Sequence, residues 1–121
     1  MSVEETRPPY DLKERTRLFA LRTIRLVSAL PKSDTGRIIG KQLLRSSTSV
    51  GANYRGASLA QSKPAFIAKL SIVLEEADEC CYWLDLIMES GLLTRDKSQE
   101  LYSEAVGLTK IFASARISAR D

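Results

Sequence analysis

Residues 63–89 read KPAFIAKLSIVLEEADECCYWLDLIME, and their apolar pattern indicates a long helix. Its apolar residues recur at alternating spacings of four and three, which is the period of one face of a helix. A second apolar row follows beside the first at spacings of seven. The two rows predict a helix over 63–89 that is the most buried in the protein. The first row contains Phe66, Leu70, Val73, Ala77, Cys80, Leu84 and Ile87, and the second contains Ile67, Leu74, Cys81 and Met88.

The flanks of this helix carry start and stop signals. Ser62 is a favoured N-cap residue, and Pro64 is tolerated in the first turn because its missing N–H has no helical partner there. Gly91 is a natural left-handed stop. Similar signals border three other segments: the expected N-caps are Asp11, in a capping-box-like pair with Glu14, then Ser33 or Asp34, and Thr94, while Pro31 ends the first segment.

These three other segments also have the helical period, and we predict helices over residues 11–29, 35–60 and 95–117. On the first, further apolar residues widen the apolar surface: Leu18, Leu21, Ile24 and Val27. The core stripes are Leu12, Thr16, Phe19, Thr23, Leu26 and Leu30; then Ile39, Leu43, Val50 and Tyr54; and finally Leu101, Ala105, Leu108, Phe112 and Ala115.

The connections between the four predicted helices are short, at about residues 30–34, 61–62 and 90–94. Short connections between long helices force neighbours to run antiparallel. We therefore predict an all-α protein, an antiparallel up-down-up-down four-helix bundle over residues 11–117. Residues 1–10 are expected to form a flexible leader and residues 118–121 a frayed end.

The composition argues against several kinds of chemistry. The chain has no histidine, which is the commonest general base and metal ligand, and its two cysteines, Cys80 and Cys81, are adjacent and expected to be free thiols. No constellation pairs an acid, a base and a nucleophile, so we expect a protein that is not an enzyme and holds no metal or cofactor. Without a secretory signal or a run of about 20 apolar residues, a cytoplasmic location off the membrane is expected.

Charge is distributed unevenly along the chain. Residues 1–60 carry 11 Lys and Arg against 5 Asp and Glu, whereas residues 61–121 carry 7 against 10. The basic half can pair with the acidic helix inside the bundle or between subunits, can bind nucleic-acid phosphates, or can simply face solvent. Arg37, Lys41 and Arg45, spaced by four, are expected to form one ridge. The candidate nucleic-acid-binding residues are Arg15, Arg22, Arg25, Arg37, Lys41, Arg45 and Arg55.

The middle of the second predicted helix is rich in small residues. Residues 45–53 read RSSTSVGAN, although glycine destabilises a helix interior by about 1 kcal/mol relative to alanine. We expect the small side chains to let a neighbouring helix approach closely. The buried hydroxyls are expected to bond to carbonyls one turn earlier.

Residues 43–55, LLRSSTSVGANYR, resemble the bacterial four helix bundle protein family, whose founding members are encoded in intervening sequences of 23S rRNA genes. Further matching residues extend the resemblance over about 11–93. It implies a ring-like homopentamer, kinship with accessory proteins of diversity-generating retroelements that engage RNA or DNA and a reverse transcriptase, and no established activity or cofactor. The family-motif residues are Arg45, Ser49, Asn53 and Arg55.

Two positions depart from the family pattern, which usually has acidic residues after the Asn-Tyr-Arg triplet and before Phe66. Here these positions hold Gly56 and Ala65. Their replacement makes the second helix still more basic. Two functions follow as hypotheses: an oligomeric nucleic-acid-binding accessory protein, or a structural and protein-interaction scaffold that binds no nucleic acid.

Overall fold

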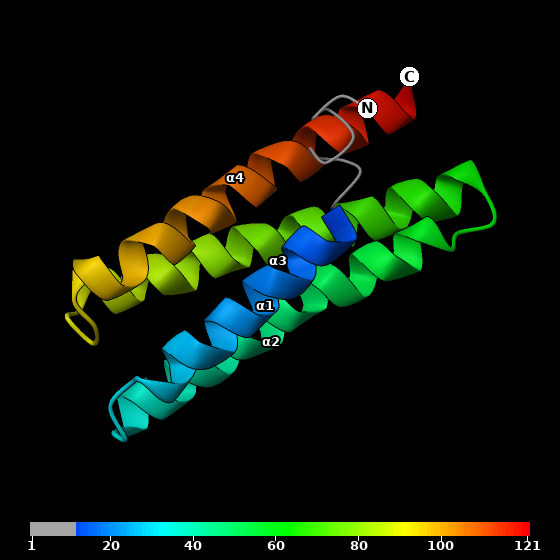
Figure 1. Ribbon diagram of the computed structural model, residues 1–121. Coiled ribbons are helices and arrows are strands. Elements are labelled where there is room, and N and C mark those ends of the chain that lie inside the picture. Colours follow the sequence, from blue (N-terminus) through cyan, green and yellow to red (C-terminus); the bar gives the residue numbers. More distant parts are fainter. Residues whose placement is uncertain (1–11) are drawn as a thin grey trace.

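The structure is a computed structural model that describes residues 12–121, and those residues form four helices. They are α1 (Leu12–Ser28), α2 (Asp34–Ser58), α3 (Lys63–Glu89) and α4 (Arg95–Arg120). Successive connections lie at opposite ends of the molecule, so the chain runs up and down (Figure 1). Each helix packs on the next in sequence, and the closing contact between α1 and α4 is the least extensive. The predicted up-down bundle is confirmed.

The predicted core is confirmed along all four helices. The largest fully buried side chains include Phe19 of α1, Leu43 of α2, Leu84 of α3 and Phe112 of α4. The half-buried Tyr54 ring stands against Phe112 with 5.5 Å between ring centroids. Burial of one apolar stripe from each helix stabilises the packing of the four helices.

The helix starts follow the predicted caps where the structure describes them. Ser33 Oγ accepts a hydrogen bond from the Gly36 N–H at 3.1 Å, and Ser62 Oγ accepts one from the Ala65 N–H at 3.2 Å. Gly91, with φ of 77°, adopts the left-handed conformation expected after α3. Thr94 occupies the N-cap position of α4, but its side chain makes no capping hydrogen bond.

Two details of the helices were not predicted from the sequence. Leu18 and Ile24, which widen the apolar surface of α1, are 46% and 44% exposed and so do not extend its buried side. The residues expected to fray continue α4 as far as Arg120, since Ala119 packs against the core. The predicted leader (1–10) and the predicted cap at Asp11 lie outside the described residues.

Small residues bring α1 and α2 together, as predicted. A Cβ placed on Gly40 would lie 3.0 Å from Leu30 Cδ1, and one on Gly51 would lie 3.3 Å from Thr16 Oγ1. The buried Ser46 hydroxyl donates to the Gln42 carbonyl at 3.0 Å, so it needs no partner on another helix. The backbones of α1 and α2 therefore lie close together, so side chains on the outer surfaces of the two helices are neighbours.

Of the helices over residues 12–121, none combines the length and apolar character needed to cross a membrane.

Candidate functional site

The outer surface between α1 and α2 has two hollows. One lies at the α1–α2 connection and the other near the start of α1. Seven-residue spacing, which returns to nearly the same side of a helix, links them. Lys41 lines the first hollow while Thr48 and Arg55 line the second, and on α1 Ala20 lines the second and Val27 the first. We call this surface the α1–α2 groove.

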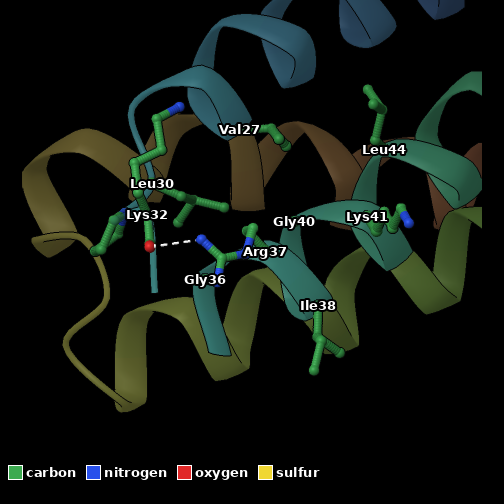
Figure 2. Close-up of a pocket in the computed structure, with 10 residues that line it drawn as sticks. Val27, Leu30, Lys32, Gly36, Arg37, Ile38, Gly40, Lys41 and Leu44 are labelled. Carbon is green, nitrogen blue, oxygen red and sulfur yellow. Dashed lines mark hydrogen bonds between the residues drawn. The ribbon is translucent and has the colours of Figure 1, made fainter. Parts of the chain in front are cut away.

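The first hollow has a volume of about 460 Å³ and combines apolar walls with cations. Lys32, Arg37 and Lys41 are its charged residues (Figure 2). Its remaining lining is Val27, Leu30, Pro31, Gly36, Ile38, Gly40 and Leu44. Such a volume is in the range of small-ligand sites, which are also mostly apolar with a few polar groups.

The second hollow, of about 250 Å³, repeats this chemistry on a smaller scale. Lys13 and Arg17 of α1 and Arg55 of α2 are its charged residues. The other residues that line it are Thr16, Ala20, Leu21, Thr48, Gly51 and Ala52. Six cations thus line the α1–α2 groove, and no Asp or Glu of the described chain lines either hollow.

Arg37 is held in place beside the first hollow. Its Nη1 donates to the Lys32 carbonyl at 2.7 Å, the dashed line in Figure 2, and its Nη2 donates to Asp34 Oδ1 at 2.6 Å. The exposed Lys41 makes no ion pair with residues 12–121. Of the three cations of this hollow, Arg37 is thus held by two hydrogen bonds, whereas Lys41 is exposed to an anion in solvent.

Three of the candidate arginines lie elsewhere. Arg15 forms a bidentate ion pair with Glu104 of α4, with both N–O distances at 2.8 Å. Arg22 and Arg25 line a hollow of about 290 Å³ between α1 and α4, together with Asp96 and Glu100. These three arginines do share a side of α1, but that side faces acidic residues of α4 and not the groove.

The predicted ridge of Arg37, Lys41 and Arg45 is wrong as a single surface. Arg45 points to α3, where its Nη1 lies 3.0 Å from Glu76 Oε2 and its Nη2 lies 2.6 Å from Glu79 Oε1. The cause is helical geometry, because each step of four residues advances about 40° around the axis. Two such steps carry Arg45 away from the groove. For Arg45, the prediction that basic and acidic helices pair inside the bundle is confirmed.

The family-motif residues divide in the same way. Asn53 Nδ2 donates to the Ser49 carbonyl at 2.9 Å, a contact within α2. Arg45 pairs with α3, and Arg55 lines the second hollow. Of the seven candidate cations, the structure brings Arg37, Lys41 and Arg55 to the groove.

Three groove residues are missing from the sequence-based candidates: Lys13, Arg17 and Lys32. The sequence did contain a signal for Lys13. Lys13, Ala20 and Val27 follow one another at seven-residue spacing, so they form one row on α1. Recognising that the row faces the glycines of α2 required the structure.

The thiols offer little reactivity. Burial raises the pKa of Cys80 to about 12, and burial also raises the pKa of Cys81. The thiolate is the nucleophilic form, so both groups are poor nucleophiles near neutral pH. Within residues 12–121, Cys, Asp and Glu side chains form no group of three that could hold a metal ion.

The fold and the groove define a class of protein: an all-α, up-down four-helix bundle with a basic outer groove. The chain belongs to the 23S rRNA-intervening sequence protein family, whose profile matches residues 10–114. It is also similar to a solved structure, a protein with unknown function from the S23 ribosomal protein family from Bacteroides thetaiotaomicron. The two are 36% identical with a TM-score of 0.80, and the match covers 86% of this chain and 96% of that one. A comparison with curated proteins finds no match.

Proposed function

We propose that this protein is a non-catalytic accessory protein that binds the phosphate backbone of RNA or DNA through the α1–α2 groove. The observation that carries this proposal is the set of six cations lining the groove, with no Asp or Glu of residues 12–121 lining it. Backbone phosphates attract such surfaces with little regard to sequence, because counterions are released on binding.

The chemistry of the remaining side chains supports a non-catalytic role. With no histidine in the chain, the usual general base is missing. The Ser46 and Ser47 hydroxyls are buried and donate to carbonyls of their own helix, at 3.0 Å for Ser46 to Gln42 and 3.2 Å for Ser47 to Leu44. The thiols are held in their protonated form by burial.

Self-assembly is the second part of the proposal, with a ring of five copies as the expected state. The outer face of α3 supports it, because Ile72 and Tyr82 are 38% and 58% exposed among acidic residues of that helix. The acidic face of one copy and a basic face of the next are complementary, and head-to-tail contacts of this kind close into rings. A ring would also repeat the α1–α2 groove around its circumference. A reverse transcriptase is a further proposed partner of such an assembly.

The experiment is a fluorescence anisotropy titration of RNA and DNA at several salt concentrations. We expect affinity to fall steeply as salt rises, and Lys41→Ala and Arg55→Ala each to reduce the salt slope by about 1. Lys110→Ala, which removes an exposed lysine of α4 that lines neither hollow, is the matched control and should leave the slope unchanged. Absence of binding at about 50 mM salt, where electrostatic contacts are strong, would refute the proposal.

A further inference from the structure

The first hollow of the α1–α2 groove has more apolar wall than phosphate binding requires. Val27, Leu30, Pro31 and Leu44 line it together with the three cations. A duplex presents phosphates and sugars to a flat basic surface and keeps its bases stacked inside. An apolar hollow between cations therefore has no use in the recognition of a duplex backbone alone.

The second hollow offers a comparison within the same groove. It carries three cations as well, but it is about 250 Å³ against about 460 Å³ for the first, and two threonines line it. Phosphate contacts alone would be served by either hollow. The larger hollow offers an organic ring more space beside its cations.

An unpaired nucleotide has the matching chemistry. Its base has two apolar faces, and the phosphates on either side of it are anionic. Proteins that bind unstacked bases hold them between aromatic or apolar side chains or against the plane of an arginine guanidinium. Arg37 supplies such a plane, fixed by its bonds to the Lys32 carbonyl and to Asp34.

We propose that the first hollow receives one unstacked base of a single-stranded nucleic acid while Lys32, Arg37 and Lys41 contact the phosphates beside it. This inference rests on the proposed function, since it names the nucleic acid that the groove prefers. The base enters beside Leu44, and the second hollow contacts phosphate further along the same strand. Recognition is tolerant of sequence, because every base has an apolar face.

The test compares three probes of equal length, about 12 nucleotides, which is within the usual site size of single-strand binders. They are an oligothymidine single strand, a strand with the same phosphates but abasic sugars, and a duplex. We expect the oligothymidine to bind roughly fivefold to tenfold more tightly than the abasic strand, in line with the stacking of one base. The duplex should resemble or fall below the abasic strand.

Two variants of Leu44 test whether the first hollow causes the preference for oligothymidine over the abasic strand. Leu44→Ser should bring the oligothymidine affinity down to that of the abasic strand and leave the abasic affinity unchanged. Leu44→Trp, which adds an aromatic face, should tighten oligothymidine binding severalfold and also leave the abasic strand unchanged. Leu86→Ser, a change at another half-buried leucine on α3, is the control. Leu44→Trp keeps the test decisive if the serine variant unfolds.

The possible failures are distinguishable. Equal binding of the oligothymidine and abasic strands, with steep salt dependence, would overturn the base site and leave phosphate binding by the groove intact. A preference for the duplex would overturn it in the same way. No binding of any probe at low salt would refute the base site and the proposed function together.

Discussion

Arg45 Nη1 lies 3.0 Å from Glu76 Oε2, and the second guanidinium nitrogen reaches Glu79, so one side chain ties α2 to α3. The hydrogen bond that Arg45 donates to Glu76 raises the pKa of Arg45, because the carboxylate favours the charged guanidinium. The Glu76 side chain is only 14% exposed, and its other oxygen has no hydrogen-bond partner in the described part of the chain. Glu76 therefore depends on Arg45 for the compensation of its charge.

Replacement of Arg45 by alanine should destabilise the bundle. Arg45→Ala leaves the carboxylate of Glu76 with poor compensation, and we expect the free energy of unfolding in urea to fall by about 1 kcal/mol. Arg37→Ala is the control, because its partner Asp34 is 90% exposed and exposed pairs contribute little. Both variants are measured at one protein concentration, since assembly shifts apparent stability. Equal losses in the two variants would contradict the special role of the Arg45–Glu76 pair.

Two glycines of α2 should respond in opposite directions to alanine. A Cβ on Gly36 would lie 2.2 Å from the Pro31 carbonyl oxygen, a backbone atom that cannot move without shifting the connection. We expect Gly36→Ala to cost about 1–3 kcal/mol, as overpacking does. A Cβ on Gly56 would find the flexible Lys69 side chain at 3.5 Å or more. Gly56→Ala should raise stability by about 0.5 kcal/mol or more through helix propensity, and thermal unfolding of both variants checks the sign.

The buried thiol of Cys80 should make stability depend on alkaline pH. Burial raises its pKa from 9.0 to about 12. Well below pH 9 the thiol is protonated in both states, so it does not change the free energy of unfolding. Between pH 9 and 12 the unfolded chain loses this proton while the folded one keeps it, so the free energy of unfolding falls as pH rises.

The measurement is a series of urea unfolding curves between pH 8 and 10.5 for the wild type and Cys80→Ala. We expect the free energy of unfolding to decline less with rising pH in the variant, because it has no thiol to ionise at this position. Native protein should also react with a thiol reagent at pH 8 far more slowly at Cys80 than unfolded protein does, since the thiolate is scarce and covered. Rapid labelling of Cys80 in the native state would show that the pocket around it opens easily.

The sequence predicted the fold because the core rows of all four helices repeat at intervals that cannot fit a strand. It was less informative about the site. The helical period tells which side of α2 faces the core, and so placed Leu43 and Val50 correctly. It does not tell which neighbouring helix meets each remaining side, so Arg45 was grouped with Arg37 and Lys41 on one ridge although it faces α3.

The arginines of α1 show the same limit of the helical period, which does not identify the neighbouring helix. Arg15, Arg22 and Arg25 share one side of α1, as the spacing predicts, yet only the packing order of the helices decides that this side meets Glu104, Asp96 and Glu100 of α4. Conversely, Lys32 reaches the groove from a connection whose path no periodicity describes. The sequence predicted on which side of its helix each side chain lies. It did not predict which side chains of different segments come together to form one surface.

The outer face of α3 provides the test of self-assembly. Asp78, Tyr82 and Asp85 follow one another at spacings of four and three, so they lie on one side of the helix, and all three are exposed. We expect light scattering to give five times the 13.5 kDa chain mass for the wild type. Asp78→Lys with Asp85→Lys should lower that mass, because reversed charges repel a basic face of the neighbouring copy.

The control is Ser103→Lys with Ser114→Lys, which adds positive charge at two exposed residues of α4 that line none of the three hollows. It should leave the mass unchanged, because only repulsion at the subunit contact, and not the altered net charge, separates the copies. A full mass in the α3 variant would exclude this face as the contact. A wild-type mass of one chain would refute assembly itself, and the α1–α2 groove would then have to bind its strand as a single site, with no avidity from neighbouring copies.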